Sequence, residues 1–239
     1  QFGRFWTHAR HFIGKDILKT HAIFWPTMLR AMGAPLYAGL NVGGFLMGSD
    51  GHKMSKSLGN VVDPFELSQR YSADAVRYYL AKDVPYGQDS AVSEAALVER
   101  YNADLANDLG NLASRARALL LRHLDGRLPT PEQTDADQSV IATGTGLAAN
   151  VRQQIGTLRL SAALEEVMQF VRQLNRYFND EQPWVLAKAE ASKQRLGTVL
   201  YNCVEGLRIT SILLEPALPD KAVQLRDSLG LTAGDMAST

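Results

Sequence analysis

The feature that most constrains the fold is a long stretch of helical periodicity in the second half of the chain. Between positions 105 and 120, apolar residues recur every three or four positions, at Leu105, Leu109, Leu112, Ala116, Leu119 and Leu120. This spacing predicts one face of a helix that begins at Ser93-Glu94 and ends near residues 125–129. Similar patterns over 138–156, 161–179 and 192–214 predict a helical bundle, with residues 129–137 as a linker.

The first 60 residues differ in character and indicate a mixed α and β segment. The pattern predicts a helix from Asp16 to Gly33, a strand at Leu36–Leu40, a turn at 41–44 and a second short strand at 45–47. Four glycines within residues 48–59 predict a loop. The expected fold class is therefore α/β followed by mainly α.

Composition and charge limit the possible classes of protein. The 239 residues are 46% hydrophobic and 21% charged, which is typical of a soluble globular protein. No apolar run reaches the ~18 residues of a membrane span, so we expect no membrane association. The single cysteine, Cys203, excludes an internal disulfide and a Cys-rich zinc site. Net charge is zero, but residues 1–60 hold seven Lys and Arg against two Asp, which favours an anionic ligand there.

The glycine-rich loop carries the clearest chemical motif, the pentapeptide KMSKS at residues 53–57. Two ammonium groups three residues apart, with two hydroxyls on a mobile backbone, suit a polyphosphate. The pentapeptide resembles the signature of class I aminoacyl-tRNA synthetases. The resemblance implies that Lys53, Ser55, Lys56 and Ser57 bind ATP. It also implies that Lys53 and Lys56 are catalytic and that Mg²⁺ accompanies ATP. The sequence itself shows no set of metal ligands, so we expect no metal site in this chain.

The segments before the loop narrow the resemblance to one family. The sequence HFIGKDI, followed after three residues by HAIFWPTML, resembles methionyl-tRNA synthetase. The resemblance implies that this helix forms one wall of the methionine pocket. Ile17, His21 and Trp25 would approach the methionine side chain, and Asp16 its polar end or the adenylate. From periodicity alone, such an apolar face is more often part of a core.

Two segments of the helical half resemble anticodon-binding elements of the same family. In the first, ANDLGNLASR, Asn111 and Arg115 are neighbours on one helix face. The second, NDEQPWVLAK, contains Pro183 and Trp184. The resemblance implies that Asn111 and Arg115 read base edges and that Trp184, held by Pro183, stacks on an anticodon base. Without the resemblance, Asn111 and Arg115 would be typical of a solvated helix face, and Trp184 of a tryptophan packed in the bundle.

These observations together predict the C-terminal half of a methionyl-tRNA synthetase, a piece of a longer enzyme, since the chain begins at Gln1. We expect the C-terminal remnant of a Rossmann catalytic domain with the KMSKS loop at 1–62 and a stem-contact or connecting region at 63–92. An α-helical bundle anticodon-binding domain at 93–231 and a frayed tail at 232–239 would follow. The expected activity is ATP-dependent methionylation of tRNA(Met), recognised through its CAU anticodon, in a cytoplasmic monomer. The missing N-terminal half would be needed, so that the fragment alone is expected to be inactive.

Two alternatives remain open. A free-standing tRNA-binding module would use the anticodon residues and would not need Lys56. A related class I synthetase for Ile, Val, Leu or Cys would share the KMSKS loop and the helical domain, although Asn111, Arg115 and the Pro183-Trp184 pair favour methionine. The chain also departs from the family at Gly43, where many relatives have His, and it lacks the His-Ile-Gly-His signature and the zinc-binding cysteines of many relatives.

Overall fold

The computed structural model describes residues 2–55, 57 and 59–231. These residues form two compact units. The first comprises the described residues up to Asp63 together with Asp83–Glu94, and the second comprises Pro64–Lys82 together with the residues from Ala95 onward. The boundaries predicted after residues 62 and 92 divide the chain by expected function, not by compact unit. They stay predictions.

A parallel pair of strands organises the first unit. Strand β1 (Arg10–Gly14) pairs with β2 (Gly39–Gly43), in register from Arg10 opposite Gly39 to Gly14 opposite Gly43. Parallel neighbours need a crossover connection. A continuous helical segment supplies it, running through Lys15–Ile17, Thr20–Phe24 and α2 (Trp25–Ala31). The unit therefore contains a βαβ arrangement, preceded by the short helices α1 (Phe2–Phe5) and η1 (Trp6–His8).

The helix predicted from Asp16 is confirmed, but two details of the predicted strands are wrong. The strand expected at Leu36–Leu40 lies at Gly39–Gly43, across residues predicted as a turn. Short strand β3 (Leu46–Met47) makes no hairpin with it and pairs in parallel with β4 (Ser90–Ala91). Backbone pairing with partners distant in sequence holds both strands, so the glycine-rich local pattern gave no signal for their position.

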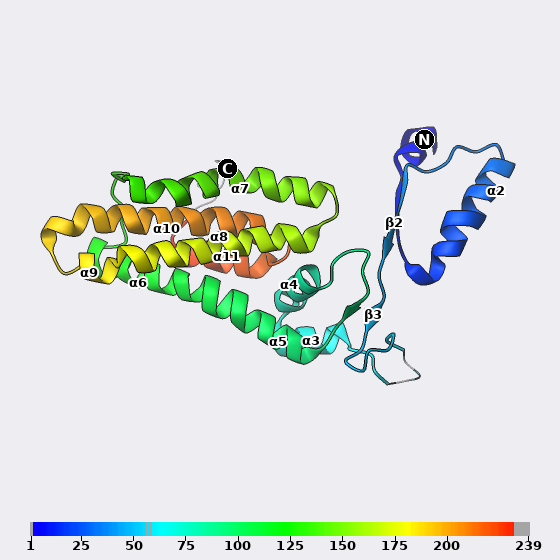
Figure 1. Ribbon diagram of the computed structural model, residues 1–239, viewed down its shortest axis with the longest axis horizontal. Coiled ribbons are helices and arrows are strands. Elements are labelled where there is room, and N and C mark those ends of the chain that lie inside the picture. The colour runs from blue at the N-terminus through cyan, green and yellow to red at the C-terminus, as the bar shows by residue number, and fades with distance from the viewer. Residues whose placement is uncertain (1, 56, 58, 232–239) are drawn as a thin grey trace. The chain divides into compact units, whose positions relative to one another are not determined.

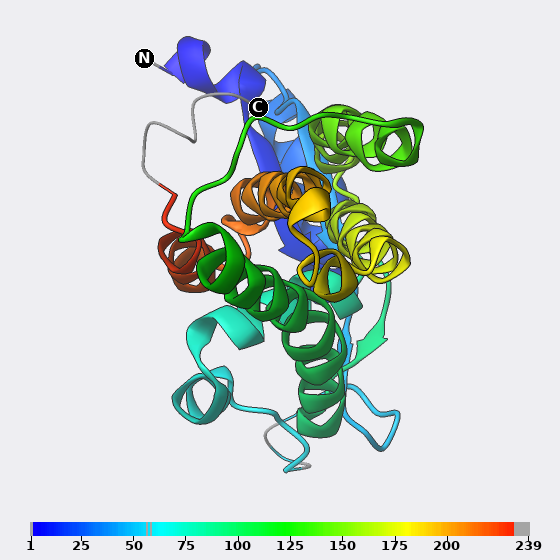
Figure 2. The same ribbon diagram turned by 90° about the vertical axis from the view of Figure 1, so that its left-hand side faces the viewer.

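The second unit is a bundle of antiparallel helices (Figure 1). Helix α10 packs against α6, α7, α8, α9 and α11 and is the central helix of the bundle. Figure 2 looks nearly along the helix axes and shows α10 surrounded by its neighbours.

Among the described residues, no helix is both long and apolar enough to cross a membrane. The elements of this unit, in chain order with two 3₁₀ turns, are α3 (Pro64–Tyr71), α4 (Ala73–Asp83), α5 (Glu94–Arg100), a π-helical stretch (Tyr101–Gly110), α6 (Asn111–Leu124), η6 (Asp135–Asp137), α7 (Gln138–Gly156), α8 (Leu160–Glu181), α9 (Pro183–Leu186), η7 (Glu190–Ser192), α10 (Lys193–Leu214) and α11 (Pro219–Ser228).

The apolar spacing of the helices accounts for the bundle. In α8, residues at intervals of three and four are almost fully buried, among them Val167, Val171, Leu174 and Phe178. Each faces the central helix or its neighbours in one continuous core. The long helices expected from sequence periodicity are confirmed here, with α5, the π-helical stretch and α6 joined into one rod.

Candidate functional site

The KMSKS loop begins as a tight turn in the first unit. Met47 and Lys53 form an isolated antiparallel bridge, and the Met54 amide donates to the Leu46 carbonyl (3.0 Å). The Lys53 ammonium lies 4.2 Å from the centre of the Phe45 ring. This cation–π contact holds Lys53 at the start of the loop while its side chain stays exposed to solvent.

Two serines and an asparagine order the rest of the described loop. The hydroxyls of Ser55 and Ser57 are 2.8 Å apart, and the Ser55 amide donates to Asn60 Oδ1 (2.8 Å). Asn60 also donates to Asp50 (3.1 Å), whose pKa is lowered mainly by a hydrogen bond from the His52 amide. The loop thus presents Lys53 and two hydroxyls on one segment. Lys56, the second predicted lysine, lies outside the described residues.

A third lysine of the same unit was missing from the predicted site. Lys15 donates to Asp89 Oδ1 (2.6 Å) and lies 5.5 Å from the centre of the Phe45 ring. Asp89 also accepts a hydrogen bond from the Phe45 amide (2.8 Å), and the Lys15 contact lowers the pKa of its carboxyl group. Lys15 lies inside the recognised GKD segment, but its partner is too distant in sequence for any local pattern to reveal.

A cavity of about 320 Å³ brings together two of the predicted methionine-binding residues. Its lining is almost entirely apolar and is formed by Trp6, His11, Thr20, His21, Phe24, Trp25 and Met28. His21 is fixed by a contact between its Nδ1 and the Ile17 carbonyl (3.0 Å), while its own carbonyl accepts a hydrogen bond from Tyr37 (2.6 Å). The Trp6 and Trp25 rings meet edge-on, with centroids 6.1 Å apart.

The other two predicted residues do not line this cavity. Asp16 and Ile17 are exposed at the start of the helical segment, and Ile17 retains 43% of its surface. Conversely, Trp6 and His11 line the cavity although no role was predicted for them. His11 Nε2 is buried without a hydrogen-bond partner among the described residues. No periodicity links Trp6 to the helix, so its place depends on the fold.

In the second unit, a cation and two aromatic rings from separate helices form a cluster that we call the α6/α9 platform: Arg115, Phe178 and Trp184. The Arg115 guanidinium lies 4.6 Å from the Phe178 ring centre and 5.4 Å from that of Trp184. It also donates to Asn179 Oδ1 (3.0 Å). Trp184 is 39% exposed, whereas Phe178 is fully buried beneath it. The platform therefore has an indole exposed to solvent beside a fixed positive charge.

The remaining predicted anticodon residues flank this platform. Asn111 is exposed at the start of α6, one turn before Arg115. Pro183 is buried at the first position of α9, where its fixed φ suits a helix start. Phe178 and Asn179, which support Arg115, were not predicted as site residues. Asn179 lies within the NDEQPWVLAK segment and Phe178 directly precedes it. The resemblance of this segment was therefore the sequence signal that could have identified both residues.

Comparison with known proteins shows which family this chain is similar to. A family model described as "tRNA synthetases class I (M)" matches residues 1–117. The methionine–tRNA ligase of Deinococcus radiodurans is 47% identical over 224 residues, which are 93% of this chain and 33% of that protein. The methionine–tRNA ligase of Mycobacterium tuberculosis is 43% identical over 232 residues, which are 96% of this chain and 44% of that protein.

Solved structures give the same result for the fold. A Mycobacterium tuberculosis methionyl-tRNA synthetase in complex with methionyl-adenylate superposes with a TM-score of 0.92 at 42% identity. The match covers 99% of this chain and 47% of that one. The free form of the same synthetase gives a TM-score of 0.88 at 38% identity.

Fold and sequence together define this chain as a member of the class I aminoacyl-tRNA synthetases. Within that class it belongs to the methionyl-tRNA synthetase family, to which its curated relatives and its structural neighbours belong. It spans less than half the length of the curated relatives described above.

Proposed function

We propose that this chain forms part of a methionine–tRNA ligase. The methionine carboxylate attacks the α-phosphate of ATP, which forms methionyl-adenylate and releases pyrophosphate. The methionyl group then passes to tRNA(Met), and AMP leaves. Neither step needs a covalent enzyme nucleophile, so positioning and charge stabilisation would provide the catalysis. We also propose that the enzyme acts as a monomer in the cytoplasm.

The observation that carries this proposal is the α6/α9 platform. Arg115 and Trp184 are the residues that the family resemblance assigns to the anticodon, and they lie beside each other although they come from different helices. An open indole face suits a splayed base, and a guanidinium beside it suits a base edge or a phosphate. Asn111 would add a second base contact, and Pro183 would hold the indole in place.

In the first unit, the cavity beside His21 and Trp25 supports a methionine site. Aromatic walls suit a polarizable thioether, and one polar histidine can orient the ligand. Asp16 and Ile17 would complete the site at its edge. Lys53, Lys56 and the hydroxyls of Ser55 and Ser57 would bind the triphosphate of ATP, which brings Mg²⁺ with it as part of the substrate.

The anticodon role is tested by titrating the chain with RNA hairpins that carry a CAU or a GAU anticodon. We expect a preference for CAU, and we expect Trp184→Ala to weaken CAU binding by about 5- to 150-fold, since stacking contributes about 1–3 kcal/mol. Trp25→Ala, in the other unit, is the control and should bind normally. Equal affinity for both hairpins would remove the anticodon assignment.

The catalytic role is tested in the intact enzyme by methionine-dependent exchange of pyrophosphate into ATP. Lys56→Ala should slow exchange by about 100-fold or more, because it removes charge from the leaving pyrophosphate. It should leave CAU hairpin binding unchanged. Lys193→Ala removes an exposed lysine of the helical unit and serves as the matched control. A Lys56→Ala enzyme with normal exchange would remove Lys56 from the catalytic role, whereas an unaltered intact enzyme without any exchange would favour a tRNA-binding module over a ligase.

A further inference from the structure

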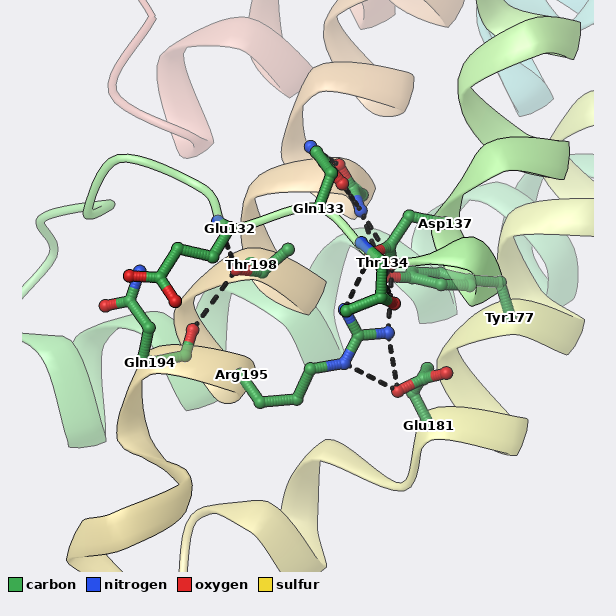
Figure 3. Close-up of polar contacts among 10 residues, drawn as sticks. Glu132, Gln133, Thr134, Asp137, Tyr177, Glu181, Gln194, Arg195 and Thr198 are labelled. Atoms are coloured by element: carbon green, nitrogen blue, oxygen red, sulfur yellow. Dashed lines mark hydrogen bonds and ion pairs between the residues drawn. The ribbon is translucent and has the colours of Figure 1, made fainter.

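A buried carboxylate gathers side chains from several elements in the second unit (Figure 3). Asp137, at the end of η6, is completely buried. It accepts hydrogen bonds from the Thr134 amide (2.7 Å), Tyr177 (2.5 Å), Asn202 (3.1 Å) and both terminal nitrogens of Arg195 (2.7 and 2.9 Å). The carboxylate is therefore fixed from several directions, and so is the guanidinium that it holds.

Arg195 holds a second carboxylate with the same guanidinium. Its Nε and Nη2 lie 3.0 and 2.7 Å from Glu181 Oε2. Arg195 and Glu181 are about four-fifths buried, with 21% and 20% of their side-chain surface exposed. Because a guanidinium is planar and donates at fixed angles, it sets the place of Glu181 relative to Asp137.

Glu181 is the last residue of α8, three positions before Trp184. Gln182 follows in the left-handed region, with φ of +47°, and turns the chain sharply into α9. Its carbonyl accepts hydrogen bonds from the amides of Val185 (2.7 Å) and Leu186 (3.2 Å). The connection from Glu181 to Trp184 is thus short and hydrogen-bonded, so displacement of the α8 end would be transmitted to the indole.

We propose that Glu181, anchored by Arg195 and Asp137, is a positioning residue that sets the Trp184 indole for stacking on RNA. This inference rests on the proposed anticodon role of Trp184. Phe178 and Arg115 also contact the indole, from below and from beside it, so Glu181 would add to their effect on its position. Glu181 itself touches Arg195 rather than RNA, so its effect on recognition passes through Trp184.

The test uses Glu181→Gln in the full chain, which leaves Asp137 paired with Arg195. The control is Glu215→Gln, because Glu215 also pairs with an arginine, Arg226 (2.8 Å), near the other end of α10, where its side chain is more exposed than that of Glu181. We expect Glu181→Gln to weaken binding of the CAU hairpin at least about threefold, within the range seen for coupled neighbours. The control should bind as the unaltered chain does.

Two further measurements distinguish positioning from general stability. In chain labelled with 5-fluorotryptophan, Glu181→Gln should shift the fluorine resonance of Trp184 and leave those of Trp6 and Trp25 in place. In a double-mutant cycle, Glu181→Gln should cost less than about twofold once Trp184 has been replaced by Ala.

The outcomes separate this inference from the proposed function. If Trp184→Ala weakens binding but Glu181→Gln does not, positioning by Glu181 is refuted and the anticodon role stands. Positioning by Glu181 is also refuted if Glu181→Gln weakens RNA binding to the same extent when Trp184 has already been replaced by Ala. If Trp184→Ala itself changes nothing, the proposed anticodon role fails first.

Discussion

At the scale of single residues, Gly44 marks a close approach of two backbone segments in the first unit. A Cβ at this position would lie 1.8 Å from the Gln88 carbonyl oxygen and 2.7 Å from the Asp89 amide nitrogen. Backbone atoms cannot rotate away, so the segments themselves would have to separate. At Gly43 the nearest atom would be the Ile13 carbonyl oxygen at 3.6 Å, which is ordinary contact.

We therefore expect Gly44→Ala to disrupt the β3–β4 pair and Gly43→Ala to leave it intact. Overpacking costs about 1–3 kcal/mol, so the amides of Ser90 and Val92 should exchange hydrogen about tenfold faster in the first variant. Both amides are hydrogen-bonded across the pair. Hydrogen exchange followed by NMR measures this, and equal protection in the two variants would contradict it.

The same scale shows what the sequence could and could not predict about the sites. His21 and Trp25 lie four positions apart on one helix, so their spacing placed them together, and they share a cavity. Trp6 enters that cavity from a separate segment, through a contact that only the fold creates. Arg115 and Trp184 were selected by resemblance to a family, because nothing in their spacing predicts that they meet.

At the scale of elements, length and periodicity decided which predictions held. Helices α7, α8 and α10 repeat their apolar pattern over many turns, and their predicted ranges are confirmed within two residues. Strands β3 and β4 have two residues each and pair across a gap of more than 40 positions. Such pairs are stabilised by backbone hydrogen bonds rather than by side-chain alternation, so a local pattern cannot place them.

The short turn η6 makes the helical unit sensitive to acid. Burial alone would raise the pKa of Asp137, but hydrogen bonds from Arg195, Tyr177 and Thr134 outweigh it and lower the pKa from 3.8 to about 2. A carboxyl group whose pKa is lower in the folded state contributes stability above its unfolded pKa. That contribution is lost as the pH falls from about 4 to 2.

Urea unfolding of the helical unit should therefore show a falling free energy of unfolding between about pH 4 and pH 2. Asp137→Asn should be less stable at neutral pH, because it leaves the Arg195 charge with a weaker partner. Its stability should also change less with pH over that window. Parallel pH profiles for the two proteins would show that other carboxyl groups account for the acid sensitivity.

At the scale of the whole chain, the two units differ sharply in how much apolar surface they bury. Among the described residues of the first unit, only Leu29 and Val92 are buried hydrophobic side chains. The second unit holds the continuous core around α10. Large apolar side chains that stay exposed in the first unit include Phe2, Phe5, Phe12, Ile23, Phe24, Met28 and Met32. Since burial of such surface is the main stabilising contribution, the units should differ in stability.

Hydrogen exchange of the chain 1–239 in solution tests this difference. We expect amides of β1 and β2 to exchange through frequent local opening, and amides of α8 and α10 to exchange only when the bundle unfolds. The cavity lined by His21 and Trp25, which we propose binds methionine, lies in the weakly packed unit. The same preparation should therefore bind the CAU hairpin yet support no methionine-dependent pyrophosphate exchange. Equal protection of β1 and α10, together with measurable exchange of pyrophosphate, would show that the first unit is stable and functional as it stands. Slow hydrogen exchange in α8 and α10 with fast exchange in β1 would support the proposal that RNA recognition needs only the bundle, whereas adenylate formation needs a rigid cavity around His21.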